Sequence, residues 1–100
     1  MKTKEQLVSL GLTEMKAEEV MLLESKMLEQ AVRFQFKKKD GSLREAVGTL
    51  RRDSMVEADG SLWEPKGEEK PVAPTIVKFW DLTVQGWRSF NVFNLVAVEG

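Results

Sequence analysis

The chain of 100 residues contains neither cysteine nor histidine. Without cysteine, no disulfide and no thiolate metal site can form, and a reducing compartment is compatible with the composition. Without histidine, the chain also lacks the side chain that most often acts as a general base near neutral pH or as a zinc ligand. No motif marks a pair of carboxylates with divided acid and base roles. We therefore predict that the protein is not an enzyme and uses no metal and no cofactor.

Long apolar runs are missing as well. No uncharged apolar run approaches the roughly 18 residues that a membrane span needs, and "MKTKEQLVSLGLTEM" has no continuous apolar centre typical of a signal peptide. A composition of 42% hydrophobic and 31% charged residues is typical of a globular domain. We expect one cytoplasmic domain that does not enter a membrane, with a helical segment at 1–30 packed on a β-barrel at 31–100.

The N-terminal segment has two helix signals. Thr3 followed by Gln6 has capping-box spacing, and Gly11 is placed to end a helix that runs to about Leu10. Thr13 can cap a second helix. Its apolar stripe falls at spacings of three and four and includes Val20, Leu23, Met27, Leu28 and Ala31. Methionines 15, 21 and 27 raise the alternative of a partner-binding groove, but packing in the core is the favoured interpretation.

From residue 32 the periodicity becomes extended. In "VRFQFKKKDGSLREAVGTL" apolar and polar residues alternate, and Asp40-Gly41 suits a two-residue turn that returns the chain antiparallel over 43–50. That register places Arg33, Lys37 and Arg44 together on the outward face. It also places Glu45 opposite Phe36, so a bulge or a longer turn is an open alternative.

Residues 53–74 hold all three prolines and predict a long variable loop, with a small hairpin at Asp59-Gly60. The runs "TIVKFWDL" and "WRSFNV" follow around Gln85-Gly86, and "LVAV" comes after a break at Phe93-Asn94. Five strands after a helical segment make a mainly β, α+β fold. We predict a small, strongly bent five-stranded barrel, because closing the sheet hides its edges.

These segments carry a family resemblance over residues 31–98. The order "VRFQFKKKDGSLREAVGTL", a variable loop, then "VKFWDLTVQGWRSFNVFNLVAV" resembles the WYL-like group of Sm-like SH3 β-barrel domains of unknown function, which are small bacterial proteins. More distantly it resembles the WYL domains of bacterial transcription regulators, whose aromatic strand and arginine-phenylalanine strand are matched by Phe79, Trp80 and Asp81 and by Arg88 and Phe90. The resemblance implies a ligand-sensing domain for nucleic acid or nucleotides, with Arg88 in the site and Trp80 and Trp87 as weaker candidates.

Charge is unevenly distributed along the chain. From the sequence, residues 1–30 carry four basic and six acidic side chains, 31–52 seven and two, 53–74 two and six, and 75–100 two and two. The first hairpin is therefore strongly basic, whereas the pI near 5.5 is low for a dedicated nucleic-acid-binding domain. The run "KKKD" is interpreted either as a solvated face, which is favoured, or as a phosphate-binding site.

A two-residue turn at Gln85-Gly86 separates the aromatic residues by face. Phe79, Phe90 and Val92 form the predicted core set, while Trp80 and Trp87 share the other face, covered by the N-terminal helix or open to a ligand. On the Phe90 side, Arg88 lies diagonal to Asp81. Two interpretations of Arg88 are open: it forms a structural ion pair with Asp81, or it donates two hydrogen bonds to a bound anion.

The sequence therefore predicts a non-catalytic binding module for nucleic acid or a small anionic ligand. The candidate ligand-binding residues are Arg88, Trp80, Trp87, Arg33, Lys37 and Arg44. The alternative is a protein-interaction or self-assembly module that forms homo-oligomers by pairing of edge strands.

Overall fold

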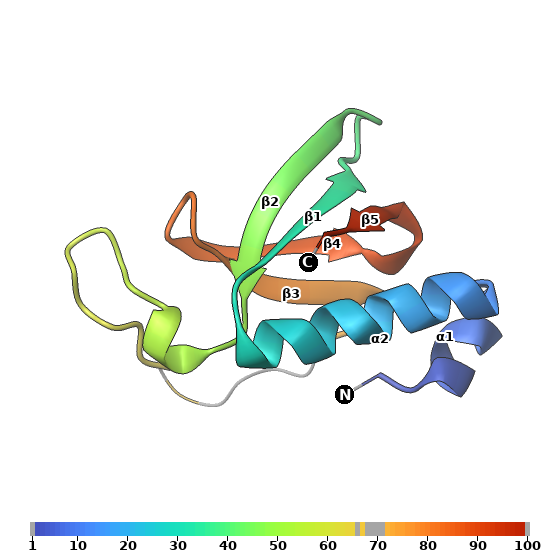
Figure 1. Cartoon of the computed structure of the whole chain (residues 1–100), viewed down its shortest axis with the longest axis horizontal. Coiled ribbons are helices and arrows are strands. Elements are labelled where there is room, and N and C mark those ends of the chain that lie inside the picture. The colour runs from blue at the N-terminus through green and yellow to red at the C-terminus, as the bar shows by residue number, and fades with distance from the viewer. Residues whose placement is uncertain (1, 66, 68–71, 100) are drawn as a thin grey trace.

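The computed structural model describes residues 2–65, 67 and 72–99 and shows two helices followed by five strands (Figure 1). Helix α1 covers Lys4–Ser9 and α2 covers Glu14–Glu29. The strands are β1 at Val32–Lys37, β2 at Leu43–Thr49, β3 at Ile76–Asp81, β4 at Gly86–Asn91 and β5 at Leu95–Val98. Short 3-10 turns occur at Arg52–Ser54 (η1) and Val92–Asn94 (η2). Neither helix in the described part of the chain has the length and hydropathy that a membrane span requires.

Both helices begin at the predicted caps. The Thr3 hydroxyl accepts a hydrogen bond from the Gln6 N–H, and the Thr13 hydroxyl accepts one from Lys16 N–H, at 3.1 and 3.2 Å. These bonds satisfy backbone donors that a helix start leaves free. The predicted helix starts are therefore confirmed.

Helix α2 packs its apolar stripe against the sheet. Val20, Leu23 and Met27 are fully buried and share one core with Leu7 of α1 and with the inward residues of the sheet. The end of α2 is fixed to β2, because the Met27 carbonyl accepts hydrogen bonds from Leu50 N–H and the Thr49 hydroxyl. Two predicted members of the stripe do not belong to it, since Leu28 is 52% exposed and Ala31 is exposed.

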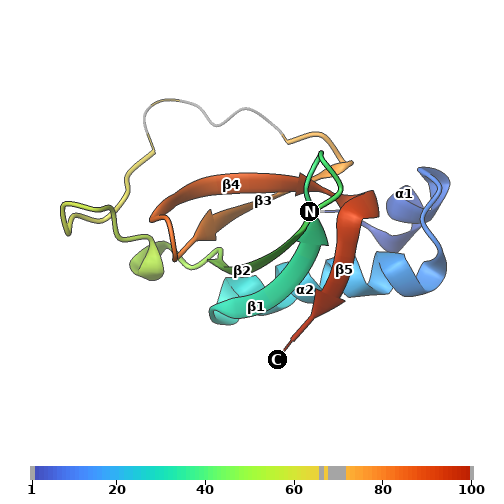
Figure 2. The same ribbon diagram turned by 90° about the horizontal axis from the view of Figure 1, so that it is seen from above.

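The sheet has the strand order β4-β3-β2-β1-β5, with every neighbouring pair antiparallel. It bends so strongly that the β1–β2 hairpin crosses β3 and β4 (Figures 1 and 2). The predicted α+β fold with a small Sm-like, SH3-like barrel is confirmed. Among the described residues β4 and β5 do not pair with each other, so the barrel is open between these two strands, which η2 connects along the chain.

The first hairpin has a three-residue loop instead of the expected two-residue turn. Phe36 pairs with Arg44 and Lys37 with Leu43, while Lys38 N–H donates to the Ser42 carbonyl. Gly41 has a φ of +85°, a conformation that is costly for a residue with a side chain. A residue in this conformation typically ends a three-residue hairpin loop. This one-residue change moves Arg44 to the same face as Phe36, so its predicted place beside Arg33 and Lys37 is wrong.

The second hairpin also differs from the expected register. Trp80 pairs with Trp87, Phe79 with Arg88 and Asp81 with Gly86, so Gly86 is already in β4 and residues 82–85 form the turn. The Asp81 carboxylate stabilises this turn by accepting hydrogen bonds from the N–H and hydroxyl of Thr83. The register shift is even, and the faces are therefore as predicted. Phe79, Phe90 and Val92 are buried in the core.

The long segment 53–74 contains the predicted small hairpin. Val56 and Leu62 form an isolated bridge, and Trp63 N–H donates to the Met55 carbonyl. Met55 is only 2% exposed, and this part of the loop therefore packs on the barrel. Part of the segment, at 66 and 68–71, lies outside the described residues.

Candidate anion-binding site

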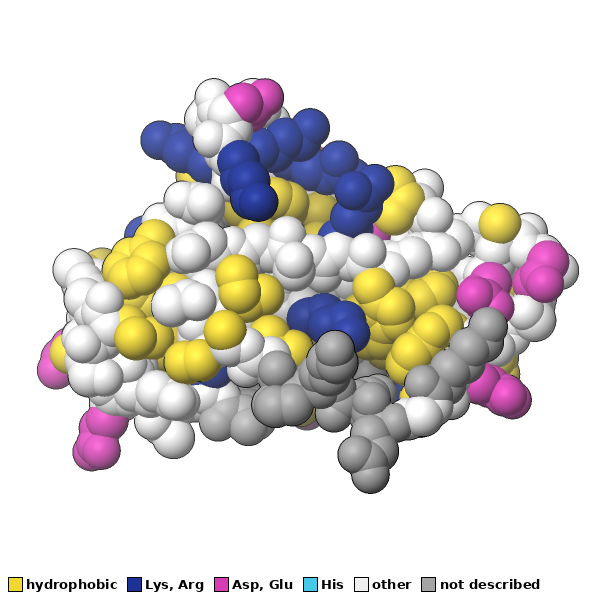
Figure 3. Space-filling model, turned by 180° about the vertical axis from the view of Figure 1, so that it is seen from behind, with side chains coloured by type: hydrophobic (Ala, Val, Ile, Leu, Met, Phe, Trp, Pro, Cys, Tyr) yellow, Lys and Arg dark blue, Asp and Glu magenta, His cyan; other side chains and the backbone are white. Residues whose placement is uncertain are grey.

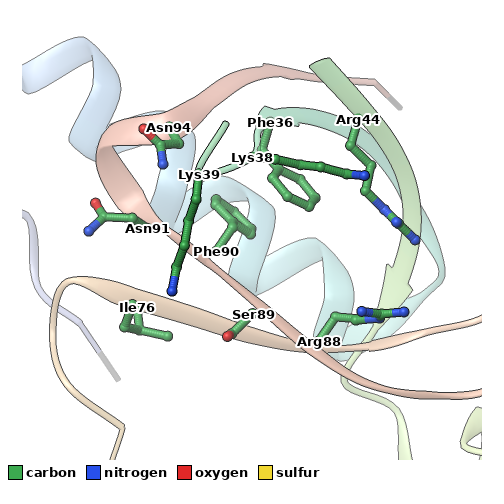
Figure 4. A pocket seen from close by; sticks show the side chains of 10 residues that line it. All are labelled: Phe36, Lys38, Lys39, Arg44, Ile76, Arg88, Ser89, Phe90, Asn91 and Asn94. Carbon is green, nitrogen blue, oxygen red and sulfur yellow. The ribbon is translucent and has the colours of Figure 1, made fainter. Parts of the chain in front are cut away.

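A cavity of about 570 Å³ opens between the tip of the β1–β2 hairpin and the β3–β4 pair (Figure 4). It exists because β2 pairs with β3 only at Gly48 and Thr49, so the outer half of the hairpin stands away from β3. We call it the basic cavity. Its basic residues are Lys38, Lys39, Arg44 and Arg88, its neutral polar residues are Ser89, Asn91 and Asn94, and its apolar residues are Phe36, Ile76 and Phe90.

Two phenylalanine rings form the apolar floor of the basic cavity. Phe36 and Phe90 stack with ring centroids 4.8 Å apart and planes 15° from parallel, and each is about 5–6% exposed. Their positions follow from the inward faces of β1 and β4. A rigid apolar floor lowers the local dielectric and so strengthens the attraction between the cations above it and an anion.

The two arginines in the cavity have different environments. Arg44 Nη2 lies 3.2 Å from Asp81 Oδ2, and the Asp81 side chain is completely buried. Arg88 has no ion pair among the described residues, although it lines the same cavity as Arg44 (Figure 4). The ion pair that the sequence suggested for Arg88 is therefore made by Arg44 instead. Arg88 keeps its planar set of N–H donors free for a ligand.

No carboxylate from the described residues lines the basic cavity. Figure 3 shows lysine and arginine side chains gathered on this face, with acidic side chains mostly toward the ends of the molecule. Four neighbouring cations repel one another, and an anion bound between them would relieve that repulsion. The arrangement thus suits a multiply charged anion or several phosphates.

Two of the predicted basic residues lie away from the cavity. Arg33 is exposed on the opposite face of β1 and contacts Glu45 at 3.4 Å, and Lys37 shares that exposed face. They cannot act with Arg88, because alternate residues of a strand face opposite sides of the sheet.

The predicted tryptophans form a separate cluster. Trp80 and Trp87 share a face as expected, but Trp63 from the long loop covers them in place of the N-terminal helix. Ring centroids are 5.6 Å apart for Trp80 and Trp87 and 5.1 Å for Trp63 and Trp87. Trp80 is 2% exposed and unavailable to a ligand, whereas half-buried Trp87 carries Lys78 Nζ 4.5 Å above its ring centroid.

Sequence reasoning missed the neutral polar residues of the basic cavity. It also left open whether the lysines of "KKKD" formed a site, and the structure places Lys38 and Lys39 at the cavity. The signal was in the turn: a three-residue loop at 39–41 places Arg44 on the same face as Phe36. Asn91 caps η2 and Asn94 is its last residue, and the sequence indicated this turn only as a break between strands.

The bent five-stranded sheet, with a 3-10 turn before the last strand, defines a small barrel of the SH3-like class. The chain belongs to the family described as WYL_2, Sm-like SH3 beta-barrel fold, whose model matches residues 20–96. The match begins inside α2 and includes every residue of the basic cavity. Neither the curated proteins nor the solved structures contain a significant match to the chain.

Proposed function

We propose that this protein is a non-catalytic binding module that holds a nucleic acid or a small anionic ligand in the basic cavity. The observation that carries the proposal is Arg88, an exposed arginine without an ion pair among the described residues, in a cavity with three further cations. Guanidinium donors bind phosphate oxygens in a bidentate manner, and neutral asparagine amides can hydrogen-bond the uncharged part of a ligand.

Fluorescence anisotropy with labelled single-stranded DNA, single-stranded RNA and duplex DNA at two salt concentrations tests this function. We expect binding that weakens as salt rises, because contacts to phosphates release counterions. Arg88→Ala should weaken binding by about tenfold, the effect of losing one charge-assisted contact of about 1.5 kcal/mol. Inorganic pyrophosphate should compete if the cavity accepts a small anion.

Arg33→Ala is the matched control. It removes the same charge from the same sheet, but from the face opposite the basic cavity. Equal losses in Arg88→Ala and Arg33→Ala would indicate nonspecific attraction to the basic hairpin. Absence of binding to every probe at low salt would rule out the nucleic-acid function.

A second candidate function is self-association through strand edges. β4 and β5 each pair with a single strand in the described structure, so both have an edge without a strand partner. On β5, the Leu95 and Val96 carbonyls accept hydrogen bonds from Lys16 Nζ, which leaves β4 as the more open edge. Light scattering over a range of protein concentrations tests this candidate. A mass that rises to a defined multiple of 11.4 kDa would support it, and a constant monomer mass would exclude it.

A further inference from the structure

A second, smaller cavity adjoins the basic cavity across the edge of the sheet. It has a volume of about 280 Å³ and is lined by Val72, Ile76, Lys78, Trp87, Arg88 and Ser89. We call it the outer cavity. Ile76, Arg88 and Ser89 line both cavities, so the two meet at the middle of β4.

The meeting point lies at an open edge. β4 is the end strand of the sheet and pairs only with β3 among the described residues. Phe90 faces inward and Trp87 faces outward from this same strand, so the basic cavity and the outer cavity present aromatic residues on opposite faces. A ligand that occupied both would pass around the edge at Arg88 and Ser89.

The two cavities repeat one chemistry. The basic cavity combines cations with the Phe36–Phe90 floor, and the outer cavity combines Lys78 with the ring of Trp87. Lys78 is an exposed, flexible side chain and can leave the ring for a nearby phosphate. A ligand that fits this repetition has flat rings joined by anionic groups, which is the chemistry of a single-stranded oligonucleotide.

We propose that the two cavities are consecutive subsites for a short single-stranded oligonucleotide. One base enters the basic cavity, the next base lies against Trp87, and the phosphate that joins them binds Arg88. The proposal rests on the proposed function and adds the class of ligand and its shortest length. A duplex cannot bind in this way, because its bases are paired and stacked inside the helix.

Isothermal titration of the protein with thymidine monophosphate, the dinucleotide pTpT and the trinucleotide pTpTpT tests the proposal. We expect affinity to rise at least about fivefold from the mononucleotide to the dinucleotide, since stacking one base on an aromatic residue adds about 1–3 kcal/mol. The trinucleotide should add little, because the neighbouring cavity at Trp63 is lined by Glu57 and Glu64, whose charges repel phosphate.

Lys78→Glu places a negative charge in the outer cavity only. It should weaken the dinucleotide about tenfold, removing the gain over the mononucleotide, and change mononucleotide affinity by no more than about twofold, because solvent screens the more distant charge. Lys37→Glu is the matched control, with the same charge change at an exposed strand residue that lines neither cavity. It should alter both affinities equally and slightly.

The outcomes separate this proposal from the function on which it rests. Equal affinity for mononucleotide and dinucleotide, with both lost in Arg88→Ala, would overturn the outer subsite and leave the basic cavity as a site for one anion. Equal dinucleotide affinity in Lys78→Glu and wild type would overturn it too. Binding of an extended glutamate-rich peptide but of no nucleotide would assign the edge of β4 to a peptide strand. That result would overturn both the two-subsite proposal and the proposed nucleic-acid function.

Discussion

Gly48 lies where two core phenylalanine rings approach β2 near its end. A Cβ atom at this position would be 2.6 Å from Phe79 Cδ2 and 3.1 Å from Phe34 Cε1. Those rings meet edge to face, 5.0 Å apart, inside the common core. Because both rings are fully buried, neither can move aside without disturbing its neighbours.

Gly48→Ala is therefore expected to lower the free energy of unfolding by about 2 kcal/mol, the usual cost of overpacking, and the Tm by about 10 °C. Gly86→Ala is the matched control, because a Cβ there meets only the Val84 carbonyl oxygen at 4.0 Å. Thermal unfolding followed by circular dichroism measures both variants. Equal Tm values for the two would show that the sheet adjusts to the added methyl group.

Asp81 sets how many charges the basic cavity offers. Its buried carboxylate accepts hydrogen bonds from Thr83 and contacts Arg44, partly neutralising one of the four cations. Each phosphate contact by a single strand contributes about −0.7 to the slope of log affinity against log salt. Three free cations thus predict a slope of about −2.

Asp81→Asn should release Arg44 and steepen that slope to about −3, while the protein becomes less stable because the ion pair is lost. Anisotropy with a single-stranded oligonucleotide at several salt concentrations measures the slope. Glu45→Gln is the control, since it releases Arg33 on the opposite face and should leave the slope unchanged. An unchanged slope in Asp81→Asn would show that Arg44 does not contact the ligand.

At the scale of elements, strand positions and the pairing within the two hairpins could be predicted, but the register of that pairing could not. Alternation of apolar residues indicated β1, β3 and β4, since a half-buried strand has a period of two. The register depends on the length of the loop. Because side chains alternate between the two faces, an odd error in the register moves a residue to the other face and an even error does not. The first hairpin was wrong by one residue, which moved Arg44 to the other face. The second was wrong by four, an even number, so Arg88 stayed on the same face of the sheet as Phe79 of β3.

The candidate site, like the sheet, could be predicted only in part from the sequence. Arg88 could be found, because its face survived the register error and the family resemblance pointed to it. Trp80 could not be excluded from the sequence, because Trp63, which covers it, comes from a loop whose docking has no periodic signal.

The first hairpin and the hairpin of the long loop both turn at the sequence Asp-Gly-Ser, at 40–42 and 59–61, with one geometry. In the first, the Asp40 carboxylate accepts hydrogen bonds from the Ser42 hydroxyl at 2.6 Å and the Ser42 N–H at 2.9 Å. The Asp59–Ser61 pair repeats both bonds. The Ser42 hydroxyl, followed by its N–H, lowers the pKa of Asp40 below the ordinary value of 3.8.

Ser42→Ala should therefore raise the pKa of Asp40 and leave that of Asp59 unchanged, and Ser61→Ala should do the reverse. A lowered pKa in the folded state gives stability that is present above pH 3.8 and lost as pH falls through the folded value. Without the hydroxyl, the folded pKa lies nearer 3.8, so this stabilisation is smaller and its loss is complete at a higher pH. Carboxyl-carbon NMR titration of each variant measures the two pKa values, and an unmoved Asp40 would disprove this role for the hydroxyl.

At the scale of the whole molecule, the described residues form one main core and one satellite cluster. The main core joins both helices to the inward face of the sheet, so these parts should unfold together. Met55 and Trp80 are equally buried but lie outside this core, under the 55–63 hairpin. The hairpin can therefore open with little effect on the rest of the molecule.

Trp63→Ala should open the 55–63 hairpin selectively, because Trp63 contacts both Trp80 and Trp87. We expect cleavage after Glu57 by a glutamate-specific protease to become at least about tenfold faster, since the cleavage rate follows the population of the opened form. Leu62→Ala is the matched control, because Leu62 is 55% exposed and contributes little packing. Equal cleavage rates in both variants and wild type would mean that the loop is mobile despite the tryptophan contacts. A large fall in Tm for Trp63→Ala would instead show that the satellite cluster and the main core are one cooperative unit.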